Sequence, residues 1–111
     1  MKINNLKSYP NNYGYNYGEL GELSSYELDY LNQFELDEIW YYYAYGSYEG
    51  YGMILMKKGD LYDAFSLGHC SCYGPLDSVN FSGKSLEDLK LSYSAEGFNE
   101  WSNLYEAALS K

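Results

Sequence analysis

Residues 38–45 read Glu-Ile-Trp-Tyr-Tyr-Tyr-Ala-Tyr, and residues 51–56 read Tyr-Gly-Met-Ile-Leu-Met. Both runs are rich in the aromatic and β-branched residues that strands favour, and Gly46-Ser47 ends the first run. Lys57-Lys58-Gly59-Asp60 supplies turn residues between the second run and a third at residues 61–67. The sequence therefore predicts a central antiparallel sheet of three to four strands.

Helix signals flank this predicted sheet on both sides. Ser24-Ser25-Tyr26-Glu27 is a capping-box sequence followed by leucines at helical spacing, which predicts a helix over residues 25–34. Toward the C-terminus, Ser85 begins another cap, and the apolar residues of 98–109 share one face of a helix. We therefore expect a single α+β domain over residues 1–111, with the sheet flanked by N-terminal and C-terminal helices.

The N-terminal tyrosines leave two structures open. Tyr13, Tyr15 and Tyr17 alternate with other residues before Gly18, as in a short edge strand. An aromatic arm that lies on the body of the domain would show the same alternation.

The composition excludes several classes of protein. Hydrophobic residues make up 46% of the 111 residues and aromatic residues 20%, far more than a disordered, charge-rich chain carries. There is no arginine, and the net charge is −9, so direct binding to a nucleic acid backbone is excluded. No apolar run reaches the ~18 to 20 residues that span a bilayer, and residues 1–17 lack a signal-peptide pattern. We expect a cytoplasmic protein.

The acidic residues are concentrated in one part of the chain. Between Lys7 and Lys57 there is no basic residue, whereas eight carboxylates lie in that interval. Such a bias costs stability through repulsion, so it suggests binding to a cationic partner such as a basic, nucleic-acid-handling protein. The alternative is that these residues only keep a tyrosine-rich surface soluble. The expected partner-binding residues are Glu27, Asp29, Glu35, Asp37, Glu38, Tyr48 and Glu49.

The only histidine and both cysteines lie together in residues 69–72, which read His-Cys-Ser-Cys. Imidazole and thiolate are ligands that zinc prefers, so we expect a structural zinc site with His69, Cys70 and Cys72 as ligands. A fourth ligand has to come from elsewhere; the nearest carboxylates in sequence are Glu49, Asp63 and Asp77, of which we select Asp77. Inert buried thiols and a reactive cysteine are the alternatives.

Two blocks of sequence carry a resemblance to known proteins. Residues 46–52, Gly-Ser-Tyr-Glu-Gly-Tyr-Gly, and residues 67–75, Leu-Gly-His-Cys-Ser-Cys-Tyr-Gly-Pro, resemble a motif pair of small phage and bacterial proteins. With its short, acidic, tyrosine-rich and arginine-free sequence, the chain resembles the phage-encoded anti-CRISPR proteins that inhibit type II CRISPR effector nucleases.

This resemblance implies a non-enzymatic inhibitor in the host bacterial cytosol. Such a protein binds the effector nuclease and blocks nucleic-acid loading or cleavage, and zinc-containing members would match the cluster at residues 69–72. Another phage counter-defence or toxin-neutralising module would use the same acidic surface. A small enzyme that depends on cysteine and histidine is the remaining alternative.

Overall fold

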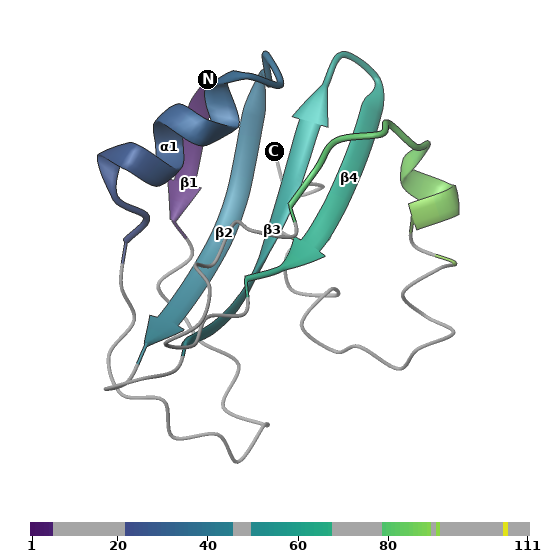
Figure 1. Ribbon diagram of the computed structural model, residues 1–111. Coiled ribbons are helices and arrows are strands. Elements are labelled where there is room, and N and C mark those ends of the chain that lie inside the picture. The colour runs from purple at the N-terminus through teal and green to yellow at the C-terminus, as the bar shows by residue number, and fades with distance from the viewer. Residues whose placement is uncertain (6–21, 46–49, 68–78, 90, 92–105, 107–111) are drawn as a thin grey trace.

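The computed structural model describes residues 1–5, 22–45, 50–67, 79–89, 91 and 106, which form a small α+β fold (Figure 1). Its elements in chain order are β1 (Lys2–Asn5), α1 (Ser25–Asn32), β2 (Glu38–Tyr45), β3 (Gly50–Lys58) and β4 (Leu61–Ser66). The predicted α+β class is therefore confirmed. The expected C-terminal helix over residues 98–109 and the alternating tyrosines at 13–17 lie outside the described residues, Glu106 excepted.

The four strands form one sheet in the order β1-β2-β3-β4. The pairs β2–β3 and β3–β4 are antiparallel, as the sequence predicts. The sheet as a whole is mixed, because β1 pairs with β2 in parallel, with Lys2 opposite Glu38. The β3–β4 connection is a two-residue hairpin in which Gly59 takes the positive φ of +60° that its first central position needs.

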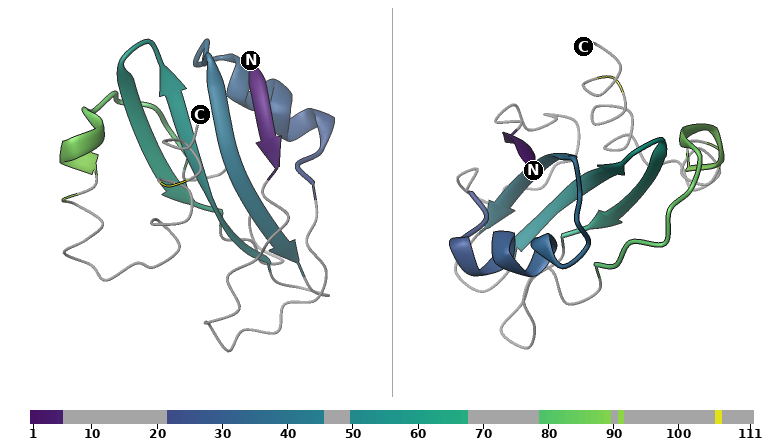
Figure 2. Two further views of the ribbon diagram at one scale, coloured as in Figure 1. Left: turned by 180° about the vertical axis from the view of Figure 1, so that it is seen from behind. Right: turned by 90° about the horizontal axis from the view of Figure 1, so that it is seen from above.

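Side chains on both faces of this sheet are buried, and α1 lies over the first face (Figure 2). On the first face, under α1, the core cluster includes Leu31, Ile39, Tyr41, Ile54 and Met56. On the second face, the cluster includes Trp40, Tyr42, Met53, Leu55 and Ala64. Burial on both sides explains why β2 and β3 read as nearly continuous apolar runs instead of alternating ones. Each large apolar side chain buried in this way contributes about 1.5–3 kcal/mol to folding.

Helix α1 begins where its capping box predicts. The Ser24 hydroxyl accepts a hydrogen bond from the Glu27 N–H at 3.3 Å, and the Glu27 carboxylate accepts one from the Ser24 N–H at 2.9 Å. Leu23 and Leu28, on either side of this cap, both belong to the first core cluster, as in a hydrophobic staple. These contacts fix the start of the helix and its approach to the sheet.

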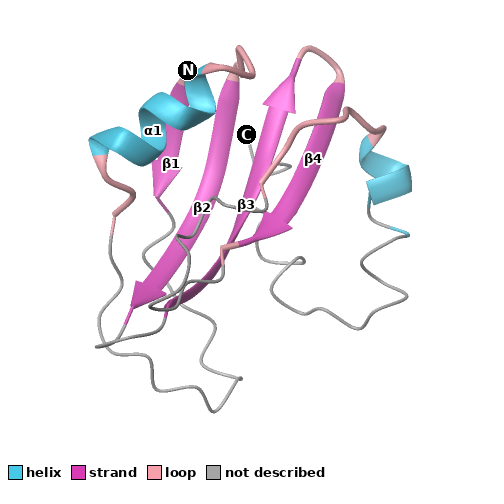
Figure 3. Cartoon of the chain, in the orientation of Figure 1, coloured by secondary structure: helices cyan, strands magenta, loops and turns pink. Residues whose placement is uncertain are grey.

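The second predicted cap is also present. Residues 86–89 are helical (Figure 3), and the Ser85 hydroxyl accepts a hydrogen bond from the Asp88 N–H at 3.2 Å. Leu86 and Leu89 of this helical turn pack into the core cluster of the second face. No helix among the described residues is long and apolar enough to cross a membrane.

Candidate partner-binding surface

The expected zinc ligands His69, Cys70, Cys72 and Asp77 lie outside the described residues. Within the part of the chain that the structure describes, no three His, Cys, Asp or Glu side chains are grouped so as to hold a metal ion. The segment that carries these ligands begins after Leu67 and ends before Val79. Both of these residues are buried in the core cluster of the first face, so the two ends of the segment are fixed on the same side of the sheet.

The expected partner-binding residues occupy two different places, and Tyr48 and Glu49 lie outside the described residues. Three of them are at the end of the molecule where the α1–β2 turn meets the β3–β4 turn. We call this region, residues 35–38 and 57–60 with Lys2, the hairpin end. The other two, Glu27 and Asp29, are on α1.

Glu38, at the hairpin end, is part of the fold. Its side chain is only 11% exposed, and it accepts a hydrogen bond from the Asn4 amide at 2.9 Å. The Lys2 ammonium lies 3.9 Å from the same carboxylate. Because the cross-strand partner of Glu38 on β3 is Lys57, two lysines from distant parts of the sequence are neighbours of this acid in the sheet.

Asp37 joins three segments of the hairpin end. Its N–H donates to the Lys57 carbonyl at 2.8 Å, and its carbonyl accepts from the Lys2 N–H at 2.9 Å. Its carboxylate accepts a hydrogen bond from the Gly59 N–H at 2.6 Å, which holds the β3–β4 turn against β2. The Asp37 side chain is thereby committed to an internal contact, although the residue is exposed.

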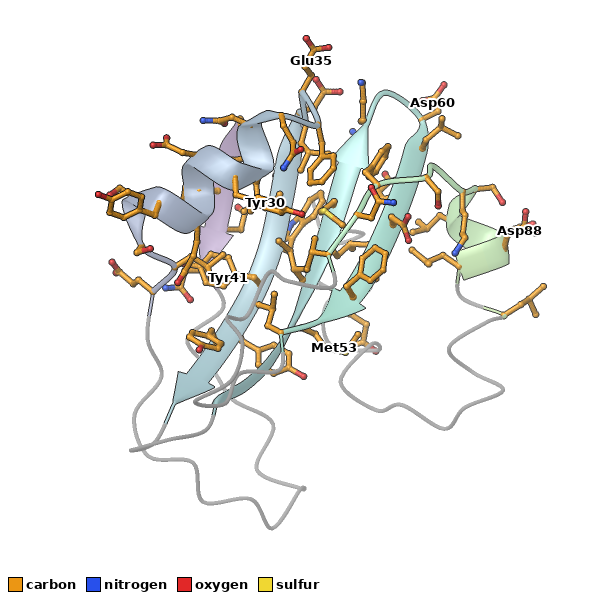
Figure 4. All side chains as sticks on the ribbon, viewed as in Figure 1. Tyr30, Glu35, Tyr41, Met53, Asp60 and Asp88 are labelled. Carbon is orange, nitrogen blue, oxygen red and sulfur yellow. The ribbon has the colours of Figure 1, made fainter. Side chains whose placement is uncertain are left out.

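Glu35, labelled at the top of Figure 4, has a side chain that is 83% exposed. It lies 3.8 Å from the Lys58 ammonium, and both side chains are well exposed. Its φ of +54° places it in the left-handed region, where it follows the last turn of α1. At the hairpin end, Glu38 and Glu35 thus lie within 4 Å of Lys2 and Lys58, which are outside the acidic interval in the sequence.

The outward surface of α1 has a different character. It consists of Tyr26, Asp29 and Tyr30, which are neighbours at i, i+3 and i+4. Tyr26 is 87% exposed, and the Asp29 side chain is exposed with no hydrogen bond or ion pair to any described residue. Tyr30 is fixed, because its hydroxyl donates to the Val79 carbonyl at 3.0 Å and its ring meets Phe34 edge-on.

The negative charge around α1 is not balanced within the helix. Residues 25–32 contain no basic residue, and Glu22 and Asp29 are exposed. Burial raises the pKa of the Tyr41 phenol beneath the start of the helix; the hydrogen bond from the Leu23 N–H lowers it, and the charges of Glu22 and Glu27 raise it. An exposed aromatic ring beside the exposed Asp29 carboxylate is suited to contact a cationic protein surface.

Sequence reasoning identified the acidic interval but not its division into two regions. The exposed Tyr26 and Tyr30 were not among the expected partner-binding residues. The signal that could have found them is their spacing from Asp29 on the predicted helix, on the side away from Leu28 and Leu31. Comparisons with protein-family models, with curated proteins and with solved structures found no match for this chain.

Proposed function

We propose that this chain is a non-enzymatic inhibitor that binds a basic, nucleic-acid-handling protein through the outward surface of α1. The observation that carries the proposal is the contrast within the acidic interval. The carboxylates of Glu35, Asp37 and Glu38 have lysine or backbone partners inside the fold, whereas the Asp29 carboxylate, beside the exposed Tyr26, has no hydrogen bond or ion pair with a described residue.

The chemistry of this surface fits such a partner. Carboxylates can occupy lysine and arginine side chains that otherwise hold phosphate groups, so binding would compete with nucleic acid. Tyr26 supplies apolar contact area and a hydroxyl, and it loses little rotamer entropy on binding, as residues at the centre of protein interfaces do. The interaction should form quickly and weaken as salt rises.

A type II CRISPR effector nuclease is the first target to test. The support for this target is the resemblance to anti-CRISPR proteins in length, acidity and tyrosine content, together with the arginine-free sequence. A pull-down from host lysate at low and high salt would identify a different cationic target, as expected of another counter-defence or toxin-neutralising module.

The test is inhibition of target-DNA cleavage by the purified effector nuclease loaded with guide RNA. We expect the double variant Tyr26→Ala, Asp29→Lys to bind the nuclease at least about tenfold more weakly and to lose inhibition. Glu87→Lys is the control, because it reverses an exposed acid away from α1 and should inhibit like the unmodified chain. Full inhibition by the α1 variant would refute the assignment of this surface.

We also propose that His69, Cys70, Cys72 and Asp77 hold a structural zinc ion. The support is the ligand chemistry of these residues and the burial of Leu67 and Val79, which fix both ends of the segment that carries them. Elemental analysis should find about one zinc per chain, and a chelator should lower the melting temperature. Zinc content near zero would instead make the two cysteines ordinary thiols.

A further inference from the structure

Residues 79–89, which we call the strap, pass around the outer edge of the sheet at β4. Val79 and Phe81 pack into the core cluster of the first face, whereas Leu86 and Leu89 pack into the cluster of the second face. Figures 1 and 2 show this green segment crossing beside β4 before the helical turn. The strap therefore contributes to both halves of the core while it covers one edge of the sheet.

The strap is anchored at its start and bent in its middle. Val79 is buried, and its carbonyl accepts the hydrogen bond from Tyr30 of α1. Gly83 has a φ of +80°, a conformation that other residues rarely adopt, and a Cβ at this position would lie 3.0 Å from the Leu61 side chain. The glycine thus allows the chain to turn closely around the sheet edge.

Lys84 is the one residue of the strap that pairs with β4 through backbone hydrogen bonds, as a residue of a neighbouring strand would. Tyr62 and Lys84 exchange two backbone hydrogen bonds, of 2.7 Å from the Tyr62 N–H and 2.8 Å from the Lys84 N–H. In a regular antiparallel ladder, the next such position outward would place Ala64 opposite Ser82. At that position, the N–H groups of both residues donate to a side-chain carboxylate.

The Asp63 carboxylate accepts the hydrogen bonds at this position. It accepts from the Ala64 N–H at 3.0 Å through one oxygen, and from the Ser82 N–H and hydroxyl, both at 2.9 Å, through the other. The Lys84 ammonium lies 3.9 Å away, and Asp63 is only 1% exposed. One buried carboxylate therefore connects β4 to the strap where backbone carbonyls normally would.

We propose that Asp63 is a latch, and that the strap beyond Val79 detaches from β4 as a unit while α1 and strands β1–β3 stay folded. Apart from the Tyr62–Lys84 backbone pair, the polar contacts between the strap and β4 share the Asp63 carboxylate, so losing it removes the hydrogen bonds to Ser82 and the ion pair with Lys84 together. A buried charge that loses some of its donors becomes costly, so the latch is either fully closed or open. Opening exposes the edge of β4 and withdraws Leu86 and Leu89 from the second face.

The experiment is hydrogen exchange of the full chain, read by mass spectrometry, for the unmodified protein and for Asp63→Asn. The amide keeps the shape of the side chain but replaces one acceptor oxygen with a donor. We expect exchange to become about 10- to 100-fold faster at residues 61–66 and 82–89, and to stay unchanged in β2, β3 and α1. Asp88→Asn is the matched control, since it makes the same change on an exposed residue of the strap, and it should leave all rates unchanged.

Two results would overturn the latch. The first is unchanged exchange in residues 82–89 of Asp63→Asn. The second is an equal acceleration in β2 and β3, which would mean that the strap opens only with the whole fold. If Asp63→Asn does not fold, Ser82→Ala decides by the same readings, because it removes one hydroxyl bond and should accelerate the same segments about fivefold.

Discussion

The hairpin end and the outward surface of α1 draw their carboxylates from the same acidic interval, but they use them differently. At the hairpin end, Asp37 and Glu38 hold β1 and the β3–β4 turn against β2. On α1, the Asp29 side chain is exposed and forms no hydrogen bond or ion pair with a described residue, and Tyr26, one turn away, is exposed as well. Acids close together in sequence can therefore be held inside the fold or left exposed, depending on what the fold brings beside them.

The charge of a stretch of sequence does not show which of its acids have partners in the folded chain. From the sequence alone, a row of acids without basic neighbours favours a surface for a cationic partner. In the folded chain, Lys2 and Lys58 from outside the interval come within 4 Å of Glu38 and Glu35. Under the proposed function, the carboxylates available to a partner are those that the fold does not pair with lysines or backbone groups.

The strongest way to test this difference is to reverse the charge of Glu38. Glu38→Lys would bury an ammonium beside Lys2 and remove one of the two acceptors of the Asn4 amide, which also donates to the Ile39 carbonyl. We expect it to lower the free energy of unfolding by about 3–5 kcal/mol, measured by denaturant titration. Asp29→Lys is the matched reversal on α1 and should cost less than about 0.5 kcal/mol. Equal costs for the two reversals would mean that the two regions do not differ.

Removing the Asp37 carboxylate should have an intermediate effect. Asp37→Ala leaves the Gly59 N–H without its acceptor and frees the β3–β4 turn from β2. Because the residue is exposed, we expect a loss of about 1.5 kcal/mol in the free energy of unfolding. Asp60→Ala, in the same turn but without a hydrogen bond to a described residue, is the control and should cost less. A loss as large in Asp60→Ala would assign the effect to turn propensity.

A substitution at Glu35 should raise the free energy of unfolding, whereas those at Glu38 and Asp37 lower it. Its left-handed backbone costs about 1–2 kcal/mol for a residue with a side chain, and glycine removes this cost while it loses more entropy on folding. We therefore expect Glu35→Gly to raise the free energy of unfolding by about 0.5–1 kcal/mol. Glu35→Ala separates the two contributions, because it removes the charge and keeps the strain. A gain with alanine as large as that with glycine would show that charge, and not backbone conformation, limits stability here.

The smallest effect on stability is expected on α1 itself. Tyr26→Ala removes an exposed ring that packs on no core cluster, so the free energy of unfolding should change by less than about 0.5 kcal/mol. Thermal unfolding followed by circular dichroism would measure this. Tyr30→Phe, which loses the hydrogen bond to the Val79 carbonyl, should cost more than Tyr26→Ala. If Tyr26→Ala lowered the free energy of unfolding more than Tyr30→Phe, the Tyr26 ring would contribute to the stability of the fold.

Local signals predicted much of the fold. The capping box of α1 could be read because Ser24 and Glu27 are three residues apart, and β2 to β4 could be read from their aromatic and aliphatic runs. Strand β1 could not, because residues 2–5, Lys-Ile-Asn-Asn, have one apolar residue and a partner far along the chain. Propensity carries no information about such distant pairing.

The candidate surface was predictable only in part, for the same reason. The acidic interval is visible in the sequence, but the ion pairs that divide it join Lys2 to Glu38 and Lys58 to Glu35 across the folded structure. The role of Asp63 was also invisible, since its donors on Ser82 come from a segment that follows the whole sheet. From the sequence alone, Asp63 is a candidate only for the fourth metal ligand.

The parallel pairing of β1 with β2 has a consequence for the order of folding. Residues 2–5 leave the ribosome before residues 38–41, and no tight turn can join two parallel strands. The β2–β3 and β3–β4 pairs are closed by short connections, so they can form without waiting for distant residues. Strand β1 would then dock late, onto the edge of β2 that already exists. Until then, its backbone N–H and C=O groups form hydrogen bonds with water.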